Sequence, residues 1–328
     1  MFTSVRFLNF KALRDATLPL GQFTLLVGPN GSGKSTALQG LKLAAHRGAF
    51  SLDRIRTLNA MGVPSVVISW EQWAIRTTAI FPDNVKVERS HEGDLRSSTD
   101  SNGLDALLHG CRFYAFDPDA IAAPVALHPG AQLMPNGANL VAVLDNLRDV
   151  DPERFEKLND DLASWLPEFD RILFETPGTG MREFFLRVAG SKQGIRASEL
   201  SHGTLFTLAL LTLANATSPP PFIAIEEPDR GVHPRMLRRV QDALYRLAFP
   251  RDYGDQRDPV QVVATTHSPF LLDLYRDRPE QIVIAEKRNG EAHFTSLVEK
   301  GDVKELLGEA RLGDLWYSGI FGGVPTEA

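Results

Sequence analysis

The chain has 328 residues, of which 43% are hydrophobic, and a formal net charge of −6 at neutral pH. This length accommodates one large α/β domain or two smaller domains, and the negative charge argues against a generally basic surface of the kind that grips nucleic acid. The single cysteine, Cys111, excludes an internal disulfide and fits a reducing cytoplasm; we expect it to be buried. No apolar run approaches the ~18 residues of a membrane-spanning helix, so we expect no membrane partner.

Two short strands are predicted near the start of the chain. Residues 5–10 alternate between apolar and polar side chains, and residues 16–20 form a second strand candidate that ends at a glycine. Such alternation is typical of a half-buried strand, and the short connection predicts an antiparallel pair. Lys11 and Arg14 lie in this connection. Solvated loop cations are the favoured interpretation, and contact with a ligand bound at the next motif is the alternative.

The strongest motif follows a predicted buried strand at residues 23–27. Gly28 to Ser35 complete the pattern G-x-x-x-x-G-K-[ST], and residues 36–46 show helical spacing. The pattern describes a loop whose backbone N–H groups cradle phosphates at a helix N-terminus. We expect Lys34 to reach the β- and γ-phosphates of ATP and Ser35 to hold Mg²⁺. The other expected nucleotide contacts are Asn30, Gly31, Ser32, Gly33 and Thr36.

An antiparallel β lobe is predicted in the next part of the chain. Residues 65–70 and 73–80 are strand candidates, residues 81–84 read as a turn, and a further strand starts near residue 85. Residues 90–103 are rich in Ser, Asp, Asn and Gly, which favours an exposed loop.

The middle of the chain contains both helices and strands. Asp151 is a plausible N-cap for a helix that starts at Pro152, because proline is favoured at the first helical position. The expected elements are helices at residues 139–147 and 152–165 and strands at residues 113–116, 171–174 and 183–188.

A serine and a glycine precede a long apolar helix expected over residues 205–216. Ser201 is a good N-cap, and Gly203 allows a ligand to approach the backbone. Taken alone, these two positions favour a structural role.

Two carboxylates end the next buried strand, residues 221–225. Glu226 and Glu227 follow it directly. Beyond a phosphate loop, the first acid can hold Mg²⁺ through water, and the second can orient or deprotonate the attacking water. The less favoured alternative is an exposed turn before Pro228.

A histidine ends another apolar run, residues 262–266. We expect His267 to lie near the edge of the sheet where open α/β sheets bind ligands. His202 and His233 are expected to be structural.

These motifs, in this order, resemble the ABC-type ATPase superfamily, and most closely its RecF/SMC/OLD-like branch of small stand-alone AAA-family ATPases. The likeness rests on the phosphate loop, Leu200–Gly203, Ile223–Pro228 and Thr265–Pro269. It implies an α/β P-loop fold: a mainly parallel sheet flanked by helices, an antiparallel β lobe and a helical lobe. One ATPase domain, residues 1–328, would contain a nucleotide-binding lobe (about 1–110 and 221–328) and a helical signature lobe (about 111–220).

The resemblance also implies a mechanism. Two copies would pack head to tail around two ATP molecules. Each site would combine the phosphate loop, Glu226, Glu227 and His267 of one copy with Ser201 and Gly203 of the other. On this basis Ser201, Gly203 and His267 change from structural to functional candidates.

The chain departs from the family pattern in several places. The metal carboxylate is Glu226 where many relatives have Asp. A glutamine loop is expected near Arg112–Pro118, but no Gln lies there, and Gln72 is a poor substitute. No heptad repeat supports a coiled-coil arm. The acidic residues after His267 do not converge in sequence, so we expect no DNA cleavage by this chain.

The leading hypothesis is a cytoplasmic, ATP-hydrolysing switch that dimerises around ATP and regulates a separate effector protein, in phage defence or DNA metabolism. The alternative is a RecF-like repair factor whose ATP-driven dimer clamps DNA. Arg235, Arg238, Arg239 and Arg246 could serve that alternative, but a solvated helix face is the favoured interpretation. A non-hydrolysing scaffold and a transporter subunit are weaker alternatives.

Overall fold

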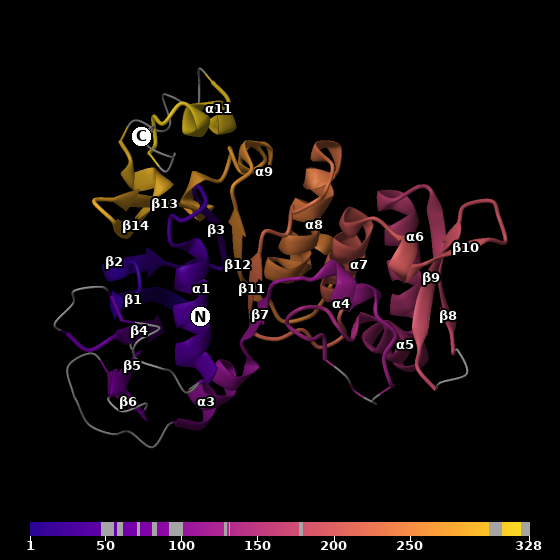
Figure 1. Cartoon of the computed structure of the whole chain (residues 1–328), viewed down its shortest axis with the longest axis horizontal. Helices are drawn as coiled ribbons and strands as arrows, with labels where there is room; N and C mark the ends of the chain where they lie inside the picture. Colours follow the sequence, from indigo (N-terminus) through magenta and orange to yellow (C-terminus); the bar gives the residue numbers. More distant parts are fainter. Residues whose placement is uncertain are drawn as a thin grey trace. The chain divides into compact units, whose positions relative to one another are not determined.

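The computed structural model describes residues 1–46, 56–57, 62–70, 73–80, 84–91, 101–127, 130, 132–176, 180–301 and 310–322. Two units can be distinguished along the chain, which Figure 1 colours by sequence. Unit 1 contains Met1–Phe113, Pro220–Ala224 and Gln261–Ala328, and unit 2 contains Tyr114–Pro219 and Ile225–Val260.

An antiparallel sheet in unit 1 has the strand order β2-β1-β4-β5-β6. Its strands are β1 (Phe2–Phe10), β2 (Leu13–Pro19), β4 (Ser65–Trp70), β5 (Trp73–Ile80) and β6 (Asn84–His91). Phe7 of β1 lies opposite Ala16 of β2 and opposite Val66 of β4. The predicted pairing of the first two strands and the predicted β lobe are therefore confirmed.

A second sheet carries the phosphate loop and has the order β14-β13-β3-β12-β11-β7. Its strands are β3 (Phe23–Val27), β7 (Arg112–Tyr114), β11 (Phe222–Glu226), β12 (Gln261–Thr266), β13 (Ile282–Arg288) and β14 (Glu291–Ser296). Both β12 and β13 pair with β3 in parallel, and β14 adds an antiparallel edge. The fully buried sequences of β3 and β12 explain their central place in the sheet.

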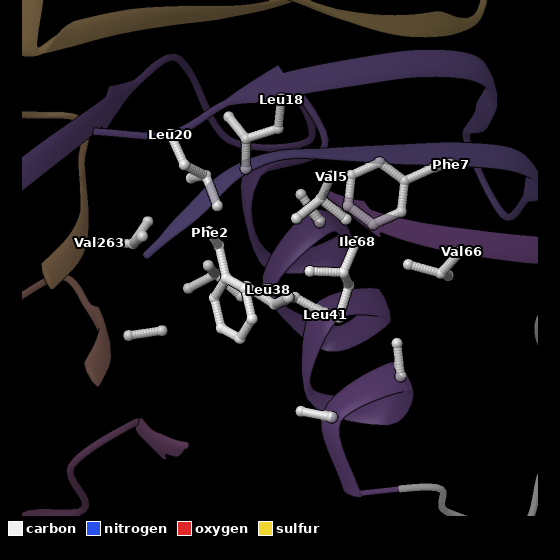
Figure 2. Close-up of a cluster of buried hydrophobic side chains, with 14 of the residues drawn as sticks. Phe2, Val5, Phe7, Leu18, Leu20, Leu38, Leu41, Val66, Ile68 and Val263 are labelled. Atoms are coloured by element: carbon white, nitrogen blue, oxygen red, sulfur yellow. The ribbon is translucent and has the colours of Figure 1, made fainter. Parts of the chain in front are cut away.

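Helix α1 (Lys34–His46) packs against the antiparallel sheet through its apolar face. Figure 2 shows Leu38 and Leu41 of α1 among the side chains of Phe2, Val5 and Ile68. The same buried cluster includes residues of the phosphate-loop sheet, so the helix that follows the loop is held firmly in unit 1. The other α-helices among the described residues of unit 1 are α3 (Ser101–Gly110), α9 (Pro269–Asp273) and α11 (Leu312–Tyr317).

Unit 2 is mainly helical. Its described α-helices are α4 (Pro118–Ala122), α5 (Leu140–Val150), α6 (Pro152–Trp165), α7 (His202–Ala214) and α8 (Leu237–Ala248). Its antiparallel sheet has the order β10-β9-β8. The strands of that sheet are β8 (Phe169–Glu175), β9 (Glu183–Val188) and β10 (Gly194–Arg196). Eleven residues of α7 are buried, and α4, α5, α6 and α8 all pack around it. An apolar helix with no polar face is stable only in such a central place.

The segment Ile225–Val260 belongs to unit 2, whereas the family resemblance implies that all of residues 221–328 belong to the nucleotide-binding lobe. The difference arises because α8 packs on α7. Strand β11 therefore begins in unit 1 and ends in unit 2.

Two local predictions need correction. The polar stretch 90–103 was predicted as loop, but its first two residues lie in β6 and Ser101–Gly103 begin α3; residues 92–100 lie outside the described residues. Arg246 is not on a solvated face, because its guanidinium binds the carboxylate of Asp161 and both side chains are largely buried.

Gln72 also lies outside the described residues. Among the helices of the described chain, none has the length and apolar character to span a bilayer.

Candidate functional site

The phosphate loop lies between buried strand β3 and the start of α1, as predicted. Gly31 and Gly33 have φ values of 79° and 100°, a conformation that L side chains rarely adopt. Asn30, Gly31 and Ser35 are exposed, whereas Ser32 and Gly33 are buried. The loop therefore combines an accessible face with a buried backbone.

Lys34 is held inside this loop. Its side chain is 6% exposed, and Nζ donates hydrogen bonds to the carbonyl oxygens of Gly28 (2.7 Å) and Pro29 (3.0 Å). A buried ammonium group needs such acceptors. The same cation is therefore already positioned at the loop that would receive phosphate oxygens.

Ser32 provides a test of whether this loop fits a phosphate group. Its Oγ is buried and has no hydrogen-bond partner among the residues that the structure describes. An orphaned hydroxyl in a buried place costs free energy unless a ligand satisfies it. Together with the left-handed glycines and Lys34, Ser32 makes a set of donors that fits a nucleotide phosphate.

Two neighbouring strands pack closely against glycines of the phosphate loop. A Cβ on Gly28 would lie 2.3 Å from the carbonyl oxygen of Ala285 in β13, and a Cβ on Gly33 would lie 2.7 Å from the Cβ of Ala292 in β14. Glycine is thus required at both positions by the neighbouring strands as well as by the turn.

His267 follows the last residue of β12. Thr266 pairs with Val27 in the parallel register, and the N–H of Gly28 donates to the carbonyl oxygen of Thr266 at 3.3 Å. The exposed His267 therefore starts its loop beside the first glycine of the phosphate loop. Ser268 then caps the short helix α9, because its Oγ accepts from the N–H of Leu271.

The paired carboxylates belong to unit 2. Glu226 is the last residue of β11, and Glu227 has a φ of 46°. A non-glycine residue in this left-handed region costs about 1–2 kcal/mol, and such outliers cluster at functional sites. The strained turn is closed by a hydrogen bond from the N–H of Arg230 to the carbonyl oxygen of Glu227 (2.9 Å).

Both carboxylates open into a small pocket within unit 2. Its lining residues are Ala115, Phe116, Phe206, Leu210, Glu226, Glu227, Pro228 and Arg230. Phe116 belongs to residues 112–118, where the family resemblance predicts a glutamine loop. None of the lining residues is a glutamine, so the glutamine of that loop stays unassigned.

Ser201 caps α7, as its sequence context predicts. Its Oγ accepts a hydrogen bond from the N–H of Thr204 at 3.1 Å, and Ser201 and His202 are exposed. Gly203 has an additional reason to be glycine, because a Cβ there would lie 2.3 Å from the carbonyl oxygen of Gly231. The capping hydrogen bond and the close packing therefore explain Ser201 and Gly203 within unit 2 without a ligand. The start of α7 is nevertheless exposed and accessible to a ligand.

The site candidates fall into two groups. The phosphate loop, Lys34 and His267 belong to unit 1, whereas Ser201, Gly203, Glu226 and Glu227 belong to unit 2. The structure brings His267 to the phosphate loop within the first group. Among the described residues, no cluster of three or more His, Cys, Asp or Glu side chains could hold a metal ion. A magnesium site built from one hydroxyl, one carboxylate and substrate phosphates needs no such cluster.

Local contacts bear on the remaining histidine and cysteine predictions. His233 accepts a hydrogen bond from the N–H of Arg235 at its turn, and the structural roles expected for His202 and His233 stay predictions. Cys111 is fully buried, and burial raises the pKa of its thiol to about 12.

Sequence reasoning missed the hairpin between β13 and β14. Asn289 and Gly290 form its two-residue turn, with φ values of 51° and 86°. Asn-Gly between two strand-forming segments is a strong signal for a type I′ hairpin, so the pattern was available in the sequence. This hairpin supplies the edge strand that contacts Gly33.

Comparison with known families now places the chain. Residues 74–273 match a family described as "AAA domain, putative AbiEii toxin, Type IV TA system". The chain belongs to this family. Residues 4–63, which include the phosphate loop, match a second family described as an AAA domain.

Individual relatives are distant. The chain is 22% identical over 348 residues to an OLD nuclease from Thermus scotoductus, a match that covers 85% of this chain and 63% of that protein. The SMC head domain from Thermotoga maritima matches with a TM-score of 0.53 and 16% identity, covering 90% of this chain and 98% of the other. A RecF structure matches with a TM-score of 0.46 and 12% identity, covering 90% of this chain and 98% of the other.

The likeness to the SMC head establishes the fold of this AAA-family chain as that of an ABC-type ATPase head. The predicted α/β P-loop architecture, with a mainly parallel sheet, an antiparallel sheet and a helical part, is thereby confirmed. The chain spans 63% of the length of the OLD nuclease that it matches.

Proposed function

We propose that this chain is a Mg²⁺-dependent ATPase that works as a molecular switch. The observation that carries the proposal is the phosphate loop, which contains buried Lys34, two left-handed glycines and Ser32, whose Oγ has no hydrogen-bond partner among the described residues. Family membership and the SMC-head fold support the same conclusion.

Bound Mg²⁺·ATP would supply the transferable phosphoryl group and a metal that neutralises its charge. Lys34 would exchange the carbonyls of Gly28 and Pro29 for phosphate oxygens. The Ser35 hydroxyl and Glu226 would hold the metal. Glu227 would accept a proton from the attacking water, and His267 would donate a hydrogen bond at the edge of the sheet.

A second copy of the chain would complete each site. Ser201 and Gly203 lie at the exposed start of α7, where the N-terminal N–H groups favour an anion. The resemblance to ABC-type heads supplies the head-to-tail arrangement, with Ser201 facing the nucleotide bound by the partner. ATP would thus close the dimer, and hydrolysis would reopen it.

The proposed biological role is regulation of an effector protein in defence or DNA metabolism. The family description names a putative toxin of a toxin–antitoxin system, and the curated relative is an OLD nuclease. Arg246 is one of the cations that could serve the DNA-clamping alternative, but its guanidinium binds Asp161 within unit 2.

The catalytic assignment is tested by phosphate release. Lys34→Ala should bind ATP weakly, and Glu227→Gln should bind ATP normally but hydrolyse it ~10²–10⁴-fold more slowly. Lys42→Ala is the matched control, since Lys42 is an exposed residue of the same helix as Lys34. Wild-type turnover by Glu227→Gln would refute its role as the base.

The shared site is tested by light scattering on Glu227→Gln, which should accumulate as a dimer when ATP is added. Adding Ser201→Arg should abolish the dimer while ATP binding persists, because the new side chain blocks the exposed helix start. Ser218→Arg, an exposed position beyond the other end of α7, is the control. A dimer that tolerates Ser201→Arg would contradict the composite site.

A further inference from the structure

The pocket of unit 2 that contains Glu226 and Glu227 also contains a cation. Arg230 lines this pocket together with both carboxylates, and it is exposed. Among the described residues, its guanidinium takes part in no ion pair. The two carboxylates have proposed roles in hydrolysis, whereas this positive charge has none.

A tight turn fixes Arg230 relative to Glu227. The N–H of Arg230 donates to the carbonyl oxygen of Glu227 at 2.9 Å, and the N–H of Val232 donates to the carbonyl oxygen of Asp229 at 3.1 Å. Pro228 occupies the second position of the first turn, where its ring holds φ near the value that the turn requires. Any arrangement that brings Glu227 to a substrate therefore brings the backbone of Arg230 with it.

The pocket is too small for an organic ligand but large enough for water. Its volume is about 60 Å³, and a water molecule needs only about 10–15 Å³ of such space. One wall is apolar and consists of Phe116, Phe206 and Leu210. Apolar surroundings lower the local dielectric constant, so a charge in this pocket acts more strongly than it would in bulk water.

We propose that Arg230 is a further catalytic residue of this ATPase, and that its guanidinium binds an oxygen of the phosphoryl group while that group is transferred to water. The inference rests on the proposed ATPase function. A guanidinium suits this role because it stays charged at every working pH and presents several N–H groups in one plane to phosphoryl oxygens. A cation that lines the same small pocket as the general base shares the space in which the water attacks.

The charges in the hydrolysis step show what Arg230 would contribute. The oxygen of a water molecule would form a bond to the γ-phosphorus of ATP, and the bond from that phosphorus to the bridging oxygen would break. The electron pair of the broken bond would stay on ADP, and a proton of the water would pass to Glu227, which would release it to solvent before the next turnover. Negative charge spreads over the equatorial oxygens of the phosphoryl group in such a transition state. Arg230 would keep its own proton and balance part of that charge.

Steady-state phosphate release and calorimetric titration test this role. Arg230→Ala should lower kcat by about 10²–10³-fold, the usual effect of removing one group that stabilises developing charge. Its KM for ATP should change little, because the contact strengthens only in the transition state. Binding of ADP with aluminium fluoride, which mimics that state, should weaken, whereas binding of the non-hydrolysable analogue AMP-PNP should not.

Arg251→Ala is the matched control, because Arg251 is another exposed arginine of unit 2 and lies outside the pocket lining. It should hydrolyse ATP at the rate of the unchanged chain. Millimolar guanidinium should restore part of kcat to Arg230→Ala by entering the vacated space, and sodium chloride at the same concentration should not. Circular dichroism checks that both variants fold.

Three results would overturn the inference. Unchanged turnover by Arg230→Ala, with Glu227→Gln slow, would remove the role of Arg230 and leave the ATPase function intact. An equal loss of affinity for AMP-PNP and for ADP with aluminium fluoride would show a contact that is not specific to the transition state. An intact chain that hydrolyses no ATP would overturn the ATPase function and this inference together.

Discussion

Gly203 has no room for a side chain in unit 2, so its replacement tests the packing of α7 directly. A Cβ at this position would lie 2.3 Å from the carbonyl oxygen of Gly231. Because the obstacle is backbone, no flexible side chain can move aside. Gly203→Ala must therefore displace either the first turn of α7 or the turn that contains Gly231.

The expected cost follows from two opposing effects. Forcing an additional methyl group into a packed site costs about 1–3 kcal/mol, and the severe overlap places Gly203→Ala at the upper end. Alanine recovers about 0.8–1.0 kcal/mol over glycine within a helix. The net loss in the free energy of unfolding should be about 2 kcal/mol, equivalent to a fall of about 3 °C in the melting midpoint of a chain of 328 residues.

Scanning calorimetry without nucleotide measures this loss. His202→Ala is the control, because His202 is an exposed neighbour in the same turn and its replacement should leave the midpoint nearly unchanged. A midpoint that is unchanged or raised in Gly203→Ala would refute the close contact with Gly231. Since nucleotide is absent, the result is independent of any role for Gly203 in a shared ATP site.

Three further predictions concern unit 1. Gly33→Ala should weaken ATP binding by about tenfold or more in calorimetric titration, and adding Ala292→Gly should restore part of the affinity, because it removes the overlap but leaves the strained φ. Burial opposes ionisation of Glu286, but the hydrogen bonds and positive charges of Lys300 and Arg288 together outweigh it and hold the Glu286 pKa below its usual 4.5. The ionised Glu286 carboxylate therefore stabilises the fold at neutral pH, and this contribution is lost as the pH falls through the folded pKa. Urea melts from pH 7 to 3 should show a shallower decline in the free energy of unfolding for Glu286→Gln than for the unchanged chain. An identical decline would contradict this. Burial raises the pKa of Cys111 to about 12, so iodoacetamide at pH 8 should leave the native chain unmodified, by mass spectrometry, until guanidinium unfolds it.

Local chemistry allowed much of the fold to be predicted from sequence. The helix Pro152–Trp165 and its N-cap Asp151 were predicted at the residues where they occur, because a capping carboxylate followed by proline is a signal contained within a few residues. Ser201 was predicted as a cap for the same reason. The strand, loop and helix around the phosphate loop could be predicted in the same way, because the glycines and Lys34 shape the backbone of their own segment.

The errors and omissions arose where a distant partner decides. Arg246 looked like one cation of a solvated helix face, but Asp161, 85 residues away along the chain, binds it. The helical start at Ser101 follows a polar stretch whose composition favours a loop. Propensity is a weak guide in such places because tertiary context overrides it.

The sequence by itself determined the phosphate loop, the strands that lead to Glu226 and His267, and the family to which the chain belongs. Each of these depends on residue types at short spacing. Only the tertiary structure decided that Gly203 has no room for a side chain beside Gly231 and that Gly33 has none beside Ala292. Those contacts join segments far apart in the chain, and they form because sheet pairing and core packing, not local patterns, bring the segments together.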